Sequence, residues 1–303
     1  MSSPTLPRVT PQAITPAGLL FLAITSVGWG LNFPVMKFLL SEWPPLASRG
    51  LAGLIGAALL ALVALALKQD LRVPRHLWPR LIGISLLTIT CWVSLMGLAL
   101  VWLPASQAAV IAISVPIWVS LMAWPALGER VSLLRAAALA VALAGIVILI
   151  GGTRIDVSVG TLPGVLLALA AAICVAAGTV ALKRFPLPLP PVALSAWQIG
   201  LGCIPVALAG LVFEQPSFAS LSFAGWLSMF YLTVIQFCVA YVCWFAALAR
   251  LPASTASIGT LMVPVIGVVS SALMLHEPLG LREIVVLAFT VGGVAVAMRA
   301  QGR

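Results

Sequence analysis

The sequence predicts an all-α membrane protein with ten transmembrane helices in two inverted five-helix repeats. Of its 303 residues, 62% are hydrophobic and only 8% are charged, whereas soluble globular chains carry roughly 25% charged residues. The apolar residues form stretches of the length that a helix needs to cross a bilayer, about 20 residues. The chain also aligns with itself at an offset of 148 residues. A lipid bilayer is therefore the solvent that this composition suits.

Ten uncharged stretches can be counted, because a charge at the bilayer centre costs about 2.5 kcal/mol or more. The first is too long for the apolar region of a secretory signal, about 7 to 15 residues, and is expected to remain as a span. Lys37 and Arg49 lie near span ends, so we expect their side chains to reach the headgroups and the deep membrane to be free of formal charge. The ten stretches are residues 17–40, 46–67, 81–102, 105–126, 133–151, 162–182, 191–213, 223–249, 253–275 and 284–298.

The basic residues predict the orientation of the spans. Lys37, Arg49, Arg154 and Arg282 would face the periplasm, and the other twelve of the sixteen basic residues would face the cytoplasm if the N-terminus does. The positive-inside rule then places both termini in the cytoplasm. The net charge of +9 is explained by topology and gives no support for nucleic-acid binding. The expected segments are a cytoplasmic N-terminus (1–16), the first repeat (17–151), a periplasmic linker (152–161), the second repeat (162–298) and a cytoplasmic tail (299–303).

The internal repeat is visible in one ungapped register. Leu103-Pro104-Ala105-Ser106 aligns with Leu251-Pro252-Ala253-Ser254, and Pro116 with Pro264, Glu129 with Glu277 and Gly145 with Gly293. Each repeat holds five spans, and an odd number makes the second copy start from the opposite side of the membrane. Inverted repeats are typical of secondary transporters, whose binding site lies near the bilayer midplane at the repeat interface. The alternative is a duplication that serves packing alone, as in some channels.

Three of the prolines inside the expected spans, Pro34, Pro116 and Pro264, are candidates for helix kinks or gates. Proline removes a backbone donor and bends a helix, and the polar backbone that it exposes must face protein or a wet cavity. The equivalence of Pro116 and Pro264 suggests paired gates. Kinks without a gating role remain the alternative.

Polar and aromatic residues at mid-depth are the candidates for a substrate cavity. Asn32 should point into the bundle, because an amide facing lipid is costly; it would either contact substrate or cap the backbone freed by Pro34. The helix face that carries Ser257 and Thr260 could instead serve close helix packing. Trp92 and Trp118 could instead contact lipid or pack in the core. The candidates are Trp29, Asn32, Thr88, Trp92, Ser114, Trp118, Gln236, Ser257 and Thr260.

A neutral cavity of this kind suits a small amphipathic solute, because aromatic faces take apolar groups or cations while amides and hydroxyls form hydrogen bonds. No Asp, Glu or His is expected at depth, so transport without an obligate proton is predicted. Glu129 and Glu277 precede helix starts, where a carboxylate favours the positive end of the helix dipole, and their role is expected to be structural.

Enzymatic functions find no support, since the sequence has no catalytic triad, metal-ligand cluster or phosphate-binding glycine loop. The five cysteines fall inside expected helices without zinc-site spacing and are interpreted as packing residues. We therefore expect no enzyme, no cofactor and no metal. The expected partners are a small-molecule substrate and the bilayer, and a monomer is compatible with the sequence.

Several of these motifs resemble the drug/metabolite transporter superfamily. They are Trp29-Gly30-x-Asn32-Phe33, the Leu-Pro-Ala-Ser blocks, Pro116 and Pro264, and Leu127-Gly128-Glu129 with Leu275-His276-Glu277. The chain is similar to the ten-helix EamA branch, and most of all to YddG-type amino acid exporters. The resemblance implies a bacterial inner-membrane exporter with a basket of helices around a central cavity. It implies amino acids as substrates, aromatic ones among them, and extends to flat cations such as methyl viologen.

One departure concerns energy coupling. In small four-helix multidrug members of the superfamily, a glutamate in the first helix couples transport to protons. Residues 17–41 of this chain contain no acidic residue. That difference agrees with uncoupled transport. Import or exchange of another metabolite, such as a nucleotide sugar, remains an alternative, as does a pore or a non-transporting membrane scaffold.

Overall fold

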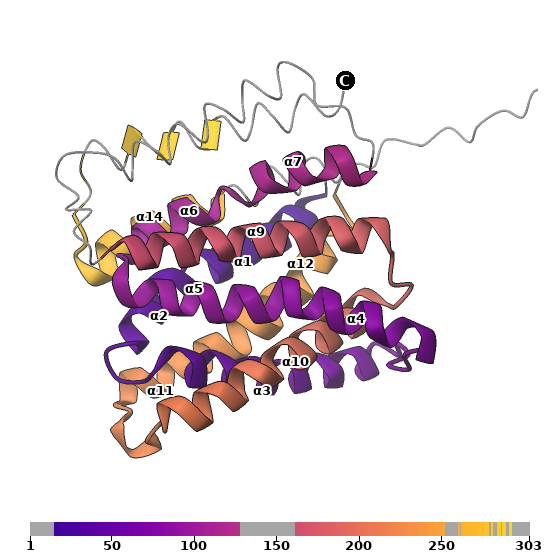
Figure 1. Cartoon of the computed structure of the whole chain (residues 1–303), viewed down its shortest axis with the longest axis horizontal. Coiled ribbons are helices and arrows are strands. Elements are labelled where there is room, and N and C mark those ends of the chain that lie inside the picture. The colour runs from indigo at the N-terminus through magenta and orange to yellow at the C-terminus, as the bar shows by residue number, and fades with distance from the viewer. Residues whose placement is uncertain are drawn as a thin grey trace, which may run out of the picture.

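The computed structural model describes residues 15–127, 161–251, 260, 262–278, 280, 284–285, 287–288 and 291–292. Within these ranges the regular secondary structure is helical and no strand occurs. Long helical rods run roughly parallel or antiparallel to one another (Figure 1). Seven of them are long and apolar enough to cross a membrane: Pro16–Leu39, Pro45–Ala66, Arg75–Trp102, Ala105–Leu127, Leu162–Arg184, Pro191–Glu214 and Phe223–Leu248.

Breaks and π-helical segments divide several of the rods into shorter helices. The π-helical segments are Leu86–Thr90, Gly210–Glu214 and Tyr231–Val239. The α-helices are α1 (Pro16–Gly30), α2 (Asn32–Leu39), α3 (Pro45–Ala66), α4 (Trp78–Ser85), α5 (Cys91–Trp102), α6 (Ala105–Ala112), α7 (Val115–Leu127), α9 (Leu162–Arg184), α10 (Pro191–Ala209), α11 (Phe223–Phe230), α12 (Ala240–Leu248) and α14 (Met262–Leu275).

The sequence marks several helix starts with proline, which lacks the N–H that a first turn leaves unpaired in any case. Pro16, Pro45 and Pro191 are the first residues of α1, α3 and α10. In α1 the Thr15 side chain adds a cap by accepting a hydrogen bond from the Gly18 N–H at 3.2 Å. These local signals explain why the spans begin where the sequence predicts.

The seven long rods match seven expected spans within a few residues, except that the third begins at Arg75 instead of residue 81. The described part of α14 lies within the expected span 253–275. The expected span 133–151, the linker at 152–160 and most of 284–298 lie outside the described residues. The count of ten and the domain boundaries therefore stay predictions.

Many large apolar side chains lie on the surface of the bundle. Phe213, Phe223 and Leu273 expose 81%, 86% and 74% of their surface, which water would disfavour and lipid accepts. The interior is rich in alanine and glycine, as expected where lipid tails cannot drive helices together and close packing must do so. The chain is a multi-pass membrane protein.

The helix contacts remain the same when the two halves are exchanged. In the second half, α9, α10, α12 and α14 are the equivalents of α1, α3, α5 and α6. The contact of α5 with α9 is matched by the contact of α12 with α1, and α3 and α6 each pack on their own equivalents, α10 and α14. Two leucines repeat this relation in detail. A Cβ built on Gly164 of α9 would lie 2.8 Å from Leu103 of the first half, and one on Gly18 of α1 would lie 2.7 Å from Leu251 of the second. The halves thus form one bundle by reciprocal packing.

Three glutamates join the halves at the end of the bundle where α2 leads to α3 and α5 to α6, and these two connections lie on the left in Figure 1. Glu42 accepts hydrogen bonds from the N–H and hydroxyl of Ser222, and Glu214 from the N–H groups of Leu46 and Ala47. Glu277 accepts from the N–H groups of Ala105 and Ser106 at 2.7 and 2.9 Å. Each carboxylate caps the N-terminus of a helix in the other half, where it offsets the dipole. We call this the glutamate end.

The structural role predicted for Glu277 is seen at the start of α6, a helix of the other half. Next to it, the Lys37 amino group donates a hydrogen bond to the Leu100 carbonyl at 2.5 Å, near the C-terminus of α5. The tight hairpin between α5 and α6 is thus held at both helix ends by charges. Glu129, its equivalent in the first repeat, lies outside the described residues.

Candidate substrate cavity

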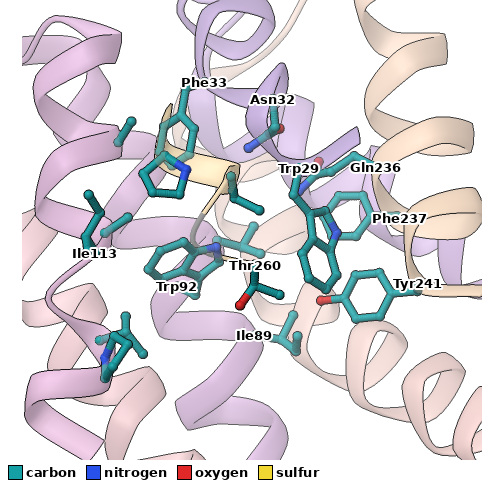
Figure 2. A pocket seen from close by; sticks show the side chains of 17 residues that line it. Trp29, Asn32, Phe33, Ile89, Trp92, Ile113, Gln236, Phe237, Tyr241 and Thr260 are labelled. Atoms are coloured by element: carbon teal, nitrogen blue, oxygen red, sulfur yellow. The ribbon is translucent and has the colours of Figure 1, made fainter. Parts of the chain in front are cut away.

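A cavity of about 350 Å³ lies in the middle of the bundle, at the lower end of the range of about 300–1,000 Å³ typical of small-molecule sites. Seventeen side chains line it (Figure 2). They come from α1, α2, the rod of α5, the rod of α6 and α7, the rod of α12, and the region of α14. Both halves therefore contribute to the wall, and no formal charge occurs on the lining residues within the described ranges.

Aromatic side chains form much of the wall. Figure 2 shows the indoles of Trp29 and Trp92 on opposite sides of the cavity, with Tyr241 beside Trp29. The Trp29 and Tyr241 rings meet edge to face with centroids 5.4 Å apart, and Trp244 supports Trp29 from 5.7 Å. Such contacts fix ring positions, so the wall presents aromatic surface in a defined place.

Two amides are the polar counterpart of these rings. Asn32 of α2 and Gln236 of the π-helical segment Tyr231–Val239 line the cavity and expose 8% and 7% of their surface. Their carbonyl oxygens are buried without a hydrogen-bond partner in the described part of the chain. Buried polar groups are usually paired, so these two are available to a solute that enters the cavity.

Seven of the residues predicted from the sequence meet around this cavity: Trp29, Asn32, Trp92, Pro116, Gln236, Thr260 and Pro264. Thr88, Ser114, Trp118 and Pro34 do not line it. Thr88 packs against α9, where a Cβ on Gly178 would lie 2.5 Å from its Cγ2. The Trp118 indole donates a hydrogen bond to the Ser114 hydroxyl at 3.2 Å. Ser257 lies outside the described residues.

The π-helical segments explain why regular helical spacing predicts Thr88 as a cavity residue, which it is not, and does not predict Tyr241, which lines the cavity. In these segments hydrogen bonds run to the fifth residue, so the face predicted from a spacing of three or four residues is displaced. Thr88 lies in Leu86–Thr90 and Trp92 after it, and the two side chains diverge. Gln236 and Tyr241 flank the end of Tyr231–Val239, and both reach the cavity. In a regular helix, five residues turn by about 500°, which would separate them.

Two of the predicted prolines lie just after breaks in the rods. α1 ends at Gly30 and α2 begins at Asn32, two residues before Pro34; α6 ends at Ala112 and α7 begins one residue before Pro116. Pro116 cannot donate to the carbonyl of Ala112, and Ala112 lines the cavity. The break before Pro116 therefore lies at the cavity wall, and a gating role for these prolines stays a prediction.

The prediction that Arg49 reaches the headgroups is wrong. Arg49 lies in the second turn of α3 and exposes 1% of its surface, so the interior of the bundle contains a formal charge. Its neighbours include Met36, to whose sulfur its Nη1 donates a hydrogen bond at 2.8 Å. A single basic residue near a span end fits snorkelling on sequence alone, because depth in a bundle depends on how the helices pack.

Comparison with known proteins agrees with this architecture. The model of the EamA-like transporter family matches the chain twice, over residues 16–151 and 162–299. A crystal structure of another protein aligns with a TM-score of 0.69 at 23% identity, covering 94% of this chain and 99% of that one, which shows a shared fold.

Two curated relatives extend the comparison. The uncharacterized transporter YvbV of Bacillus subtilis is 30% identical, with 91% of this chain and 90% of the relative covered. A probable amino-acid metabolite efflux pump of Escherichia coli is 29% identical, with 86% and 88% covered. With a family match over both halves and relatives covered along nearly their whole length, this membrane protein belongs to the EamA-like transporter family, consistent with the drug/metabolite transporter superfamily that its motifs resemble.

Proposed function

We propose that the protein is a secondary transporter that exports small amphipathic metabolites, amino acids first among them, by alternating access through the central cavity. The observation that carries the proposal is the cavity itself, which is walled by both halves and combines aromatic rings with two unpartnered amide oxygens. A neutral amino acid offers an apolar side chain for the rings and an ammonium group for the amides. The name of the Escherichia coli relative favours the same substrate class.

The proposed setting is the bacterial inner membrane with both termini in the cytoplasm. The glutamate end then faces the periplasm, which follows from the distribution of basic residues and the positive-inside rule. Reporter fusions at the two termini test this orientation. A terminus on the periplasmic side would contradict it.

The proposed energy source is the substrate gradient, without an obligate proton. Among the lining residues that the structure describes there is no acid and no histidine, the groups that proton-coupled carriers usually place at depth. Flux in proteoliposomes should persist when the pH gradient is collapsed at a fixed substrate gradient. Flux that disappears under that condition would refute the uncoupled mechanism.

Counterflow into proteoliposomes against a panel of amino acids, nucleotide sugars and dications such as methyl viologen tests the substrate class. We expect saturable uptake of neutral amino acids. A nucleotide sugar is disfavoured because no basic residue is among the described residues of the cavity wall, where its phosphates would have to be bound. Conductance without saturation would instead indicate a pore, and no flux of any solute would indicate a scaffold.

Alanine variants test the cavity residues. Trp29→Ala, Asn32→Ala and Gln236→Ala should each lower counterflow at least several-fold while membrane insertion is unchanged. Trp124→Ala is the matched control, because Trp124 lies on α7 with 61% of its surface exposed and is outside the cavity. If the three cavity variants transport as the control does, the cavity is not the substrate site.

A further inference from the structure

Arg49 is a buried cation whose hydrogen-bonding capacity is mostly unused. Its Nη1 donates to the sulfur of Met36, and a thioether is a weak acceptor. Among the residues that the structure describes, its Nε and Nη2 have no hydrogen-bond partner. These two nitrogens form the side of the guanidinium whose N–H groups point in parallel, the arrangement that binds both oxygens of one carboxylate.

No carboxylate of the described chain pairs with this arginine. The three glutamates at the glutamate end, Glu42, Glu214 and Glu277, direct their oxygens at helix N-termini. A buried charge without a partner is costly, and an apolar residue of similar size in its place is often neutral or stabilising. A cation that no described carboxylate neutralises is suited to a partner from outside the protein.

The contacts of Arg49 on α2 and α5 lie about one helical turn beyond residues of the cavity wall. Met36, its contact, is one turn beyond the cavity residues Asn32 and Phe33 on α2. On α5, a Cβ built on Gly97 would lie 3.1 Å from Arg49 Cδ, and Gly97 is one turn beyond the cavity residue Val93. Tyr241, which also lines the cavity, is near enough to interact with the arginine's charge. Met36 has an adaptable side chain, so its displacement is a short route from cavity to guanidinium.

We propose that Arg49 is the carboxylate-binding residue of the transport site and makes the carrier selective for α-amino acids over amines and dications. The substrate carboxylate binds Nε and Nη2 after Met36 moves aside, while the amide oxygens of Asn32 and Gln236 accept hydrogen bonds from the ammonium group. The proposal rests on the proposed amino acid transport. It departs from the expectation that flat cations such as methyl viologen are substrates, because a buried positive charge beside the cavity repels them.

The test compares each amino acid with its amide, which keeps the side chain and ammonium group but has no carboxylate. Counterflow of L-phenylalanine and L-leucine is measured against L-phenylalaninamide and L-leucinamide. The wild type should prefer the acids at least about tenfold, the effect of hydrogen bonds to a charged group. Arg49→Met and Arg49→Gln should bring the ratio to about one, and Arg49→Lys should keep part of the preference because it keeps the charge. The ratio is independent of how much protein is folded.

Thermal unfolding separates this role from a structural one. Arg49→Met removes an unpartnered charge, so its melting temperature should equal or exceed that of the wild type, and added L-phenylalanine should raise the melting temperature of the wild type but not of the variant. Lys37→Met is the matched control, since the Lys37 amino group has an acceptor in the Leu100 carbonyl. That variant should melt at a lower temperature and keep the wild-type preference for acids.

Three results would overturn the proposal. Arg49→Met that transports with the wild-type ratio would remove Arg49 from the site and leave amino acid transport intact. Equal transport of acid and amide by the wild type would do the same. A wild type that transports neither compound would contradict the proposed function itself, and the role of Arg49 with it.

Discussion

Asn32 and Gln236 place amide groups in a cavity wall that is otherwise mainly aromatic and aliphatic. Within a bilayer, an unpaired amide reduces stability wherever it is buried, so its value must lie in what it binds. Gln198 on α10 provides a comparison inside the same molecule. Its Nε2 is also buried without a hydrogen-bond partner, yet the residue is not among those that line the cavity.

Substituting each glutamine by methionine should therefore separate stability from transport. Methionine keeps the length of the side chain and removes the polar group, so both Gln236→Met and Gln198→Met should be neutral or stabilising by up to about 1–3 kcal/mol. Gln236→Met should lower counterflow of neutral amino acids, and Gln198→Met should leave it unchanged. The measurements are thermal unfolding and initial counterflow rates. Equal loss of transport in both variants would contradict a role specific to the cavity.

Single residues also show where the sequence is sufficient and where it fails. Trp29 and Asn32 are predictable, because a spacing of three residues puts them on one side of the rod even across the break at residue 31, and an amide must turn away from lipid. Arg49 is not predictable in this way. A position near a span end fits both the headgroup region and the bundle interior, and helix packing decides between them.

At the level of elements, the spans and prolines are predictable, and the π-helical segments are not. Hydropathy determines a span regardless of its internal hydrogen bonding, so Phe223–Leu248 is found although nine of its residues, Tyr231–Val239, are π-helical. The side chains of this rod, however, face other directions than regular helical spacing predicts, so the sequence analysis does not find Tyr241 as a cavity residue. The first repeat has its own π-helical segment, Leu86–Thr90, whose residues align at the offset of 148 with residues 234–238 of the second. Both halves therefore deform at equivalent places beside the cavity.

The contact between α3 and α10 depends on backbone approaching backbone. A Cβ built on Gly50 would lie 2.4 Å from the Ala207 nitrogen and 2.5 Å from its Cα. Backbone atoms within two packed helices cannot move aside separately, so the helices must separate to admit even one methyl group. Gly50→Ala should destabilise the protein by about 1–3 kcal/mol or more.

Gly83 of α4 is the matched control for this prediction. A Cβ at Gly83 would meet nothing within 4 Å, and alanine is favoured over glycine inside a helix by roughly 0.5–1 kcal/mol. Gly83→Ala should therefore stabilise the protein slightly. Thermal unfolding of the two purified variants measures the difference, and equal melting temperatures would show that the approach of α3 to α10 does not limit stability.

For the whole molecule, alternating access requires the seam between the halves to open at one end while it closes at the other. At the glutamate end the seam is closed by side chains as well as by carboxylates. Trp43 exposes 2% of its surface, packs on Phe218 with centroids 5.0 Å apart, and donates its indole N–H to the Ser217 carbonyl at 2.7 Å. Together with the caps formed by Glu42, Glu214 and Glu277, these contacts must break if this end is to admit or release a solute.

Glutamine variants of the three glutamates test whether the three capping contacts break together. Each variant removes the charge and keeps one acceptor, so each cap should weaken by about 0.5–2 kcal/mol. If the end opens as one unit, every single variant raises hydrogen exchange at all three capped helix starts, near Ala47, Ser106 and Ser222. The effects of combined variants then multiply in the opening equilibrium, tenfold for about every 1.4 kcal/mol.

Asp70→Asn is the control for this experiment, because Asp70 accepts a hydrogen bond at 2.9 Å from the Arg72 N–H within its own loop and joins no halves. It should leave exchange at the three helix starts unchanged. If each glutamate variant instead raises exchange at its own helix alone, the caps are independent, and the end does not open by a single movement of one half against the other. Transport rates of the same variants test the mechanism further. If the glutamate end opens as a unit, weakening it should change the rates of inward and outward flux together, because both directions pass through that one transition.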